Sequence, residues 1–150
     1  MDEHYTDLHK AVLRRDIDLS RSLLEAGADI NAQDKDGWTP LYQACRCLSF
    51  ETVRFLLDHG ADPNICTADN STPLHAACMN SSVDYVRILL QHGADPGSKD
   101  RFGETALDKI AYLDQKSSVR EEILDLFREY APELILERFC TRGPGPGGMR

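Results

Sequence analysis

Apolar positions recur along this chain at helical spacing, and the whole pattern repeats every 33 residues. The sequence Gly-Ala-Asp marks the repeat, at residues 27–29, 60–62 and 93–95. A threonine followed two residues later by leucine keeps the same register, at Thr6, Thr39, Thr72 and Thr105. Two independent landmarks in one register predict a stack of similar units, which bury their apolar faces against each other.

Each unit is predicted to contain two helices. The recurring threonine suits the N-cap of the first helix, because its hydroxyl accepts a bond from a free backbone N–H. In the second and third units Pro40 and Pro73 follow the threonine, at a position where a missing N–H costs nothing. An apolar stripe at helical spacing marks the second helix, and Gly27, Gly60 and Gly93 end it in the left-handed conformation.

Polar segments join successive units, at residues 34–37, 67–70 and 100–103. Gly37, Asn70 and Gly103 share one register within these segments. All three are residue types that tolerate a positive φ, so each segment is predicted to make a tight turn.

Two segments carry a resemblance to a known family. Residues 38–44 read Trp-Thr-Pro-Leu-Tyr-Gln-Ala and residues 71–77 read Ser-Thr-Pro-Leu-His-Ala-Ala, and each precedes a Val-Arg-x-Leu-Leu helix and Gly-Ala-Asp-Pro. In these features the chain resembles the ankyrin repeat family over residues 4–131. The resemblance implies an all-α repeat solenoid of about four ankyrin repeats, each a helix-turn-helix with a projecting β-hairpin finger. It also implies that His9 and His75 join a hydrogen-bond network between repeats.

The organisation of the chain follows from this resemblance. One ankyrin repeat domain is expected over residues 1–132, with repeats at about 4–36, 37–69, 70–102 and 103–132. Repeat four carries an insertion near residues 114–118, and Ser118 is expected to cap a helix over residues 119–130. Residues 133–140 are predicted to form a C-terminal capping helix, with an exposed docking segment as the alternative. Residues 141–150 have no apolar content to bury and are expected to be disordered.

Composition narrows the class of protein. The chain has 150 residues and a net charge of −8, which argues against a partner with a phosphate backbone and so against nucleic acid. No apolar run is long enough to span a bilayer, and the acidic N-terminus lacks a secretory signal. Five cysteines, an odd number, predict free thiols in a reducing compartment, the cytoplasm or the nucleus.

Two of the cysteines share a position in successive repeats. Cys45 and Cys78 lie at a site that Val12 fills in repeat one and Ala111 in repeat four. These are small residues, so buried packing is expected in place of metal binding, and Cys45-x-Cys47 lacks the companion ligands of a zinc site. No spacing suggests a catalytic triad, so we expect neither enzyme activity nor a cofactor.

One departure from the family concerns the turn inside each repeat. The family usually has glycine there, but this chain has Leu48 in repeat two and Ser81 in repeat three. We expect Leu48 to pack with Phe50 in an ordinary way and not to bind a partner.

The resemblance implies a non-catalytic protein–protein interaction module, an adaptor or scaffold that is a monomer by itself. Its partner protein would bind a concave face built from the fingers and the first helices. Trp, Tyr and Arg are enriched at binding hot spots, so this face offers plausible anchors. Carried over by position, its residues are Lys35, Asp36, Trp38, Arg46, Cys47, Asp69, Ser71, Met79, Asn80, Arg101, Phe102, Glu104 and Tyr112.

Other interpretations stay open at this point. The C-terminal segment of an adaptor could dock a second machine such as a ubiquitin ligase, or the chain could be a microbial or viral effector delivered into a host cell. The family also suggests a modification, the hydroxylation of Asn31, which follows Gly-Ala-Asp. The alternative role for this asparagine is an amide that stabilises its turn.

Overall fold

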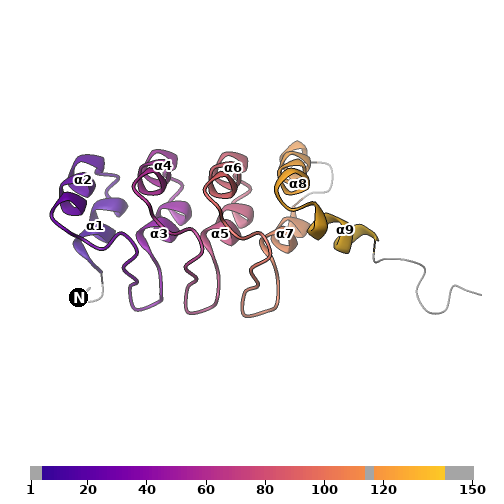
Figure 1. The fold of residues 1–150 in the computed structure, drawn as a ribbon, viewed down its shortest axis with the longest axis horizontal. Coiled ribbons are helices and arrows are strands. Elements are labelled where there is room, and N and C mark those ends of the chain that lie inside the picture. The colour runs from indigo at the N-terminus through magenta and orange to yellow at the C-terminus, as the bar shows by residue number, and fades with distance from the viewer. Residues whose placement is uncertain (1–4, 114–116, 141–150) are drawn as a thin grey trace, which may run out of the picture.

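The structure, a computed structural model, describes residues 5–113 and 117–140. Its helices form a row of repeats in two layers, with α1, α3, α5 and α7 in one layer and α2, α4, α6 and α8 in the other (Figure 1). Their bounds are α1 Asp7–Leu13, α2 Ile17–Glu25, α3 Pro40–Arg46, α4 Phe50–Asp58, α5 Pro73–Met79, α6 Val83–Gln91, α7 Ala106–Lys109, the 3-10 helix η1 Ile110–Tyr112, α8 Ser118–Tyr130 and α9 Pro132–Cys140.

The predicted threonine caps are confirmed in every repeat. Each threonine hydroxyl accepts a bond from the backbone N–H three residues later, at Thr6, Thr39, Thr72 and Thr105. Pro40 and Pro73 occupy the first helical position, and Gly27, Gly60 and Gly93 follow the second helices with φ between 85° and 95°. The local signals in the sequence therefore position the helix ends as expected.

A continuous core runs between the two layers. The leucines that follow each capping threonine are at most 2% exposed, at Leu8, Leu41, Leu74 and Leu107. Leu56 of α4 and Leu89 of α6 meet them from the other layer and are fully buried. Since every repeat shares this core with its neighbours, the molecule is an α-helical repeat solenoid.

The loops between repeats project as fingers beyond the layer of first helices (Figure 1). Gly37, Asn70 and Gly103 all have a positive φ, as predicted. Neighbouring fingers are joined by backbone bonds from Ala68 N–H to Asp36 O and from Arg101 N–H to Asp69 O, both 3.0 Å. No β-strand is assigned anywhere in residues 5–113 and 117–140, so the fingers there are tight turns without the strand pairing of a β-hairpin.

Gly37 is the point at which one finger comes closest to the next. A Cβ at this residue would lie 2.7 Å from the backbone nitrogen of Ala68, whereas a Cβ at Gly103, which has a similar φ, would meet open space. We expect Gly37→Ala to lower the free energy of unfolding by about 2 kcal/mol more than Gly103→Ala, because both strain φ but only one displaces a neighbouring backbone. Urea unfolding of both variants measures the difference, and equal losses would contradict the close approach.

The C-terminal helices differ from expectation at their starts. Ser118 is the first helical residue of α8, so the prediction that Ser118 is the N-cap is wrong. The N-cap is Ser117, and its side chain makes no capping bond. Ile123 and Phe127 of α8 are fully buried, as predicted. The predicted capping helix is α9, which lies beside α8 and begins one residue early, at Pro132. The expectations for residues 114–116 and 141–150 lie outside the described residues.

The first helix of repeat four is shortened, and its register changes as a result. Helix α7 has only four residues and continues as the tighter η1. Ile110 is buried there, while Ala111 is exposed, so the expected core role of Ala111 is wrong. Cys45 and Cys78 are fully buried, as expected, and burial raises the pKa of both thiols well above the ordinary value.

The turn inside repeat two exposes apolar surface. Leu48 has a φ of 53°, a left-handed conformation that is strained for a side chain with a Cβ, and it is 51% exposed. Phe50 is 39% exposed and its ring meets the Tyr85 ring edge to face, with centroids 5.5 Å apart. The expectation that Leu48 packs in an ordinary way is therefore wrong.

Candidate functional site

A groove of about 260 Å³ lies between the fingers and the first helices, where the concave face was expected. We call it the inner groove. It spans repeats two to four, and its lining residues are Tyr42, Arg46, Asp69, Ser71, Met79, Asp100, Arg101, Phe102 and Lys109. The caps and finger turns described above position these side chains, because the lining comes only from first helices and fingers.

The structure brings together most of the residues expected to bind a partner. Those that line the inner groove directly are Arg46, Asp69, Ser71, Met79, Arg101 and Phe102. Trp38 and Glu104 contact the lining residues Tyr42 and Lys109, and Tyr112 donates to Glu104. Lys35 and Asp36 are exposed on the first finger and do not line the groove. Asn80 is also outside the lining, and its side-chain amide donates to Cys45 O at 3.3 Å. Half-buried Cys47 is also outside the lining.

An aromatic pair forms one end of the inner groove. The rings of Trp38 and Tyr42 meet edge to face with centroids 5.0 Å apart, and the guanidinium of Arg46 lies 5.8 Å from the Trp38 ring centre. Trp38 is half-buried by this packing. The hydroxyl of Tyr42 donates to Ser71 Oγ at 3.3 Å, which ties the α3 side of the groove to the next finger.

An exposed phenylalanine forms the other end. Phe102 is 72% exposed at the tip of its finger. The Arg101 guanidinium and the Lys109 ammonium lie 5.1 and 5.8 Å from its ring centre. Arg101 also pairs with Asp69 of the preceding finger at 2.9 Å. The ring is thus held between cations and presents its apolar surface to solvent.

An ion cluster supports the base of this finger. Lys109 Nζ lies 2.6 Å from Asp100 Oδ2 and 2.5 Å from Glu104 Oε2, and the Lys109 and Asp100 side chains are nearly buried. Burial alone would raise the pKa of Asp100, but bonds from Lys109 and from backbone N–H groups hold it below its ordinary value. Bonds from Lys109 and Tyr112 lower the pKa of Glu104, and the two carboxylates raise the pKa of Lys109 against its own burial. The cluster is therefore fully charged near pH 7.

Comparison with known proteins identifies the architecture. A family model described as "Ankyrin repeats (3 copies)" matches residues 8–100 and 51–124, which together make up most of the chain. The chain belongs to the ankyrin repeat family. Among curated proteins it is similar to protein phosphatase 1 regulatory subunit 27 of Mus musculus and Homo sapiens, 47% identical over 38 residues, and to the human 2-5A-dependent ribonuclease, 53% identical over 38 residues.

These alignments are short. They cover 25% of the chain and 25% of each phosphatase subunit, and only 5% of the ribonuclease. The chain thus matches a quarter or less of the length of these relatives. Ankyrin repeats are generic protein-interaction modules and generally non-catalytic, so the similarity shows the type of module and leaves its partner open.

The histidines of the ankyrin pattern connect neighbouring repeats, as the resemblance implied. His9 Nε2–H donates to Trp38 O at 2.8 Å, and His75 Nε2–H donates to Glu104 O at 2.9 Å. The Nδ1 atom of His75 accepts from Thr72 N–H at 3.2 Å, which sets its tautomer. Burial outweighs the bond to the Glu104 carbonyl and lowers the pKa of His75. These buried rings are structural, since each bonds the threonine cap of its own helix through one nitrogen and the next finger through the other.

Asn31 performs the turn-stabilising role proposed as the alternative to modification. Its side-chain oxygen accepts from Asp62 N–H at 2.9 Å, and Asn64 repeats this contact with Asp95 N–H at 2.7 Å. The hydroxylation of Asn31 stays a prediction.

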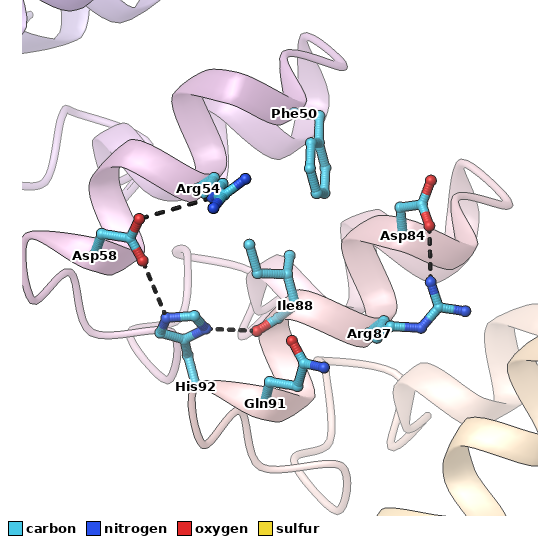
Figure 2. Close-up of a pocket in the computed structure, with 8 residues that line it drawn as sticks. All are labelled: Phe50, Arg54, Asp58, Asp84, Arg87, Ile88, Gln91 and His92. Atoms are coloured by element: carbon cyan, nitrogen blue, oxygen red, sulfur yellow. Dashed lines mark hydrogen bonds and ion pairs between the residues drawn. The ribbon is translucent and has the colours of Figure 1, made fainter.

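A second groove lies on the outer layer, between α4 and α6, and Figure 2 shows its lining. Its volume of about 330 Å³ exceeds that of the inner groove, but its charged side chains pair with one another. Asp58 contacts Arg54 at 3.9 Å and His92 at 3.6 Å, and Arg87 contacts Asp84 at 2.9 Å. We place the candidate site in the inner groove, because it presents Phe102 and Met79 as exposed anchors.

The described residues give no support for a metal site, a disulfide or a membrane-spanning helix. Within residues 5–113 and 117–137, no three His, Cys, Asp or Glu side chains are grouped to hold a metal ion. The four cysteines described are all free thiols. None of the helices in the described part of the chain has the length and hydropathy that crossing a membrane requires.

Sequence reasoning missed three lining residues of the inner groove, Tyr42, Asp100 and Lys109. Tyr42 occupies the same repeat position as the structural histidines His9 and His75, so its contribution to the surface could not be recognised from the sequence. Asp100 and Lys109 lie nine residues apart in a finger and a helix, and neither segment alone predicts their contact.

Proposed function

We propose that this ankyrin repeat chain is a non-catalytic adaptor or scaffold that binds a partner protein through its inner groove. The observation that carries the proposal is the exposure of Phe102, at 72%, and Met79, at 53%, over a groove rich in arginine and aromatic side chains. Such side chains dominate binding hot spots when a partner buries them. The printed name of two relatives, a phosphatase regulatory subunit, fits an adaptor role. We propose the cytoplasm or nucleus as its location, because the described cysteines are free thiols.

Affinity capture with mass spectrometry tests this proposal. The chain is used as bait beside Phe102→Ala and the double variant Trp38→Ala/Phe102→Ala. We expect the partner to be recovered about tenfold less with Phe102→Ala and less again with the double variant, because hot-spot truncations cost more than about 1 kcal/mol of binding.

The matched control is Phe50→Ala, which removes a partly exposed phenylalanine from the outer groove. The amount of partner recovered with Phe50→Ala should equal the amount recovered with the wild type. Equal capture by wild type and the double variant would refute a role for the inner groove. Circular dichroism of each bait confirms that the helices are retained.

A second docking surface at α9 is supported by one observation. Leu134 and Ile135 pack against the core, while Leu136 is 57% exposed. We propose α9 as the place where an adaptor of this kind would recruit a second machine such as a ubiquitin ligase. Leu136→Asp should then abolish capture of that second protein and leave capture through the inner groove unchanged; if both proteins are retained, α9 serves only as a cap.

A further inference from the structure

The last residues of the first-layer helices, with η1 taken as the end of α7, fall in one repeat register. These residues are Leu13 at the end of α1, Arg46 at the end of α3, Met79 at the end of α5 and Tyr112 at the end of η1. All four are exposed, and Arg46 and Met79 line the groove itself. The groove therefore offers equivalent positions from neighbouring repeats two and three, and these repeats stand side by side in the row of repeats (Figure 1).

The spacing of this row selects a backbone conformation for the partner. Helices that pack side by side lie about 8–10 Å apart, so this is the distance between contact points in neighbouring repeats. A polyproline-II segment advances about 9 Å in three residues and has three residues per turn, so residues three apart point the same way at that distance. A β-strand brings side chains to one face about every 7 Å, which falls out of step with the row. An α-helix with its side chains is about 10–12 Å wide. The groove has a volume of only about 260 Å³ although it extends over three repeats, so it is too narrow for a helix.

The charges of the groove indicate which charged side chain of a partner would bind there. Arg101 is paired with Asp69, and Lys109 is paired with Asp100 and Glu104. Within the part of the chain that the structure describes, Arg46 is the lining cation with no carboxylate opposite it, and it contacts only the Trp38 ring. An exposed arginine beside an aromatic ring is complementary to a carboxylate.

The next contact point along the row is apolar. Met79 and Phe102 are exposed by 53% and 72%, and both line the groove, Met79 from a helix end and Phe102 from a finger tip. Aromatic-lined grooves recognise polyproline-II segments, whose fixed backbone loses little entropy on binding.

Resting on the proposed function, we infer that the inner groove binds a polyproline-II segment of its partner protein. This segment carries a proline or apolar residue between Met79 and Phe102 and, three residues away, an Asp or Glu against Arg46. The intervening residues face solvent and carry no requirement beyond the extended backbone.

Panning a phage-displayed library of short random peptides on the full chain tests the inference. The expected consensus has an acid and a proline or apolar residue three positions apart. Panning on Arg46→Glu should replace the acid of the consensus by Lys or Arg. A consensus without this spacing, or one that Arg46→Glu leaves unchanged, would overturn the inference.

A selected peptide is then titrated while the emission of Trp38 is recorded, because Trp38 is the only tryptophan of the chain. Placing proline at both intervening positions should keep the affinity within about threefold, since proline favours the bound backbone. A loss of tenfold or more would show a helical or strand-like partner and refute the inference. Exchanging the acid for lysine should weaken binding about tenfold to the wild type and restore it to Arg46→Glu.

The outcomes separate this inference from the proposed function. If no peptide is enriched but lysate capture still depends on Phe102, the partner docks as a folded surface, and only the inference fails. If peptides are enriched equally on Trp38→Ala/Phe102→Ala, they bind elsewhere and the inference fails; both proposals fail if lysate capture is also unchanged by this double variant.

Discussion

Replacing Lys109 by methionine is expected to lower the free energy of unfolding by about 3 kcal/mol, because it removes one partner of a buried ion pair. The Lys109 side chain is 12% exposed and that of Asp100 only 6%. Methionine keeps the length and apolar stem of lysine but leaves the Asp100 carboxylate buried without its counter-charge. Urea unfolding followed by circular dichroism measures the loss.

Lys10→Met is the matched control for this change. Lys10 has the same repeat register as Lys109, but its ion pair with Asp7, at 4.0 Å, joins two well-exposed side chains. The control should change stability by less than about 0.5 kcal/mol. If the two variants lose equal stability, the buried cluster contributes nothing beyond a surface pair.

The effect of Lys109→Met should also depend on pH. The folded-state pKa of Asp100 is lowered, so its contribution is present above the ordinary carboxyl pKa and is lost as pH falls through the lowered value. The folded-state pKa of Lys109 is raised, so its contribution is present below the ordinary lysine pKa and is lost at higher pH. The difference in the free energy of unfolding between the wild type and Lys109→Met should stay constant from about pH 5 to pH 9 and decrease below about pH 4.

Replacing His75 by leucine is the second change with a large expected effect, a loss of about 2–3 kcal/mol. The ring is 1% exposed, and it serves the Glu104 carbonyl of the next finger and the Thr72 N–H of its own helix cap. Leucine matches much of the volume but leaves both backbone groups buried and unpaired. His92→Leu, on the outer groove, should cost less than about 1 kcal/mol in the same unfolding assay.

The pH profile distinguishes the hydrogen-bonding role of His75 from simple packing. Its pKa in the folded state is lowered by burial, so the unfolded chain binds the proton more readily. The stability that the neutral ring provides is therefore full above about pH 6.5 and declines as pH falls below it. Wild type should lose stability between pH 7 and pH 5 more steeply than His75→Leu, and parallel profiles would contradict this account.

Most of the fold could be predicted from the chain because its signals are local and repeated. The threonine caps, the prolines at the first helical position and the glycines after the second helices act within a few residues, and all three are confirmed. The prediction failed where local signals competed, as at Ser118 and at Ala111. At Ser118 the helix begins one residue earlier than expected, and at Ala111 the tighter turn of η1 buries the preceding residue, Ile110, instead.

The sequence by itself determined the repeat, its register and most of the residues that line the inner groove, since a 33-residue period places equivalent side chains on one surface. Only the tertiary structure decided what those side chains do. Lys10, Gln43, Ala76 and Lys109 share one register, yet Lys109 alone meets a buried carboxylate, because Asp100 comes from a finger that folds back over it. Arg101 is likewise neutralised by Asp69 from the preceding finger, while Arg46 faces only a ring. Charge pairing depends on distances between repeats, which no pattern along the chain specifies.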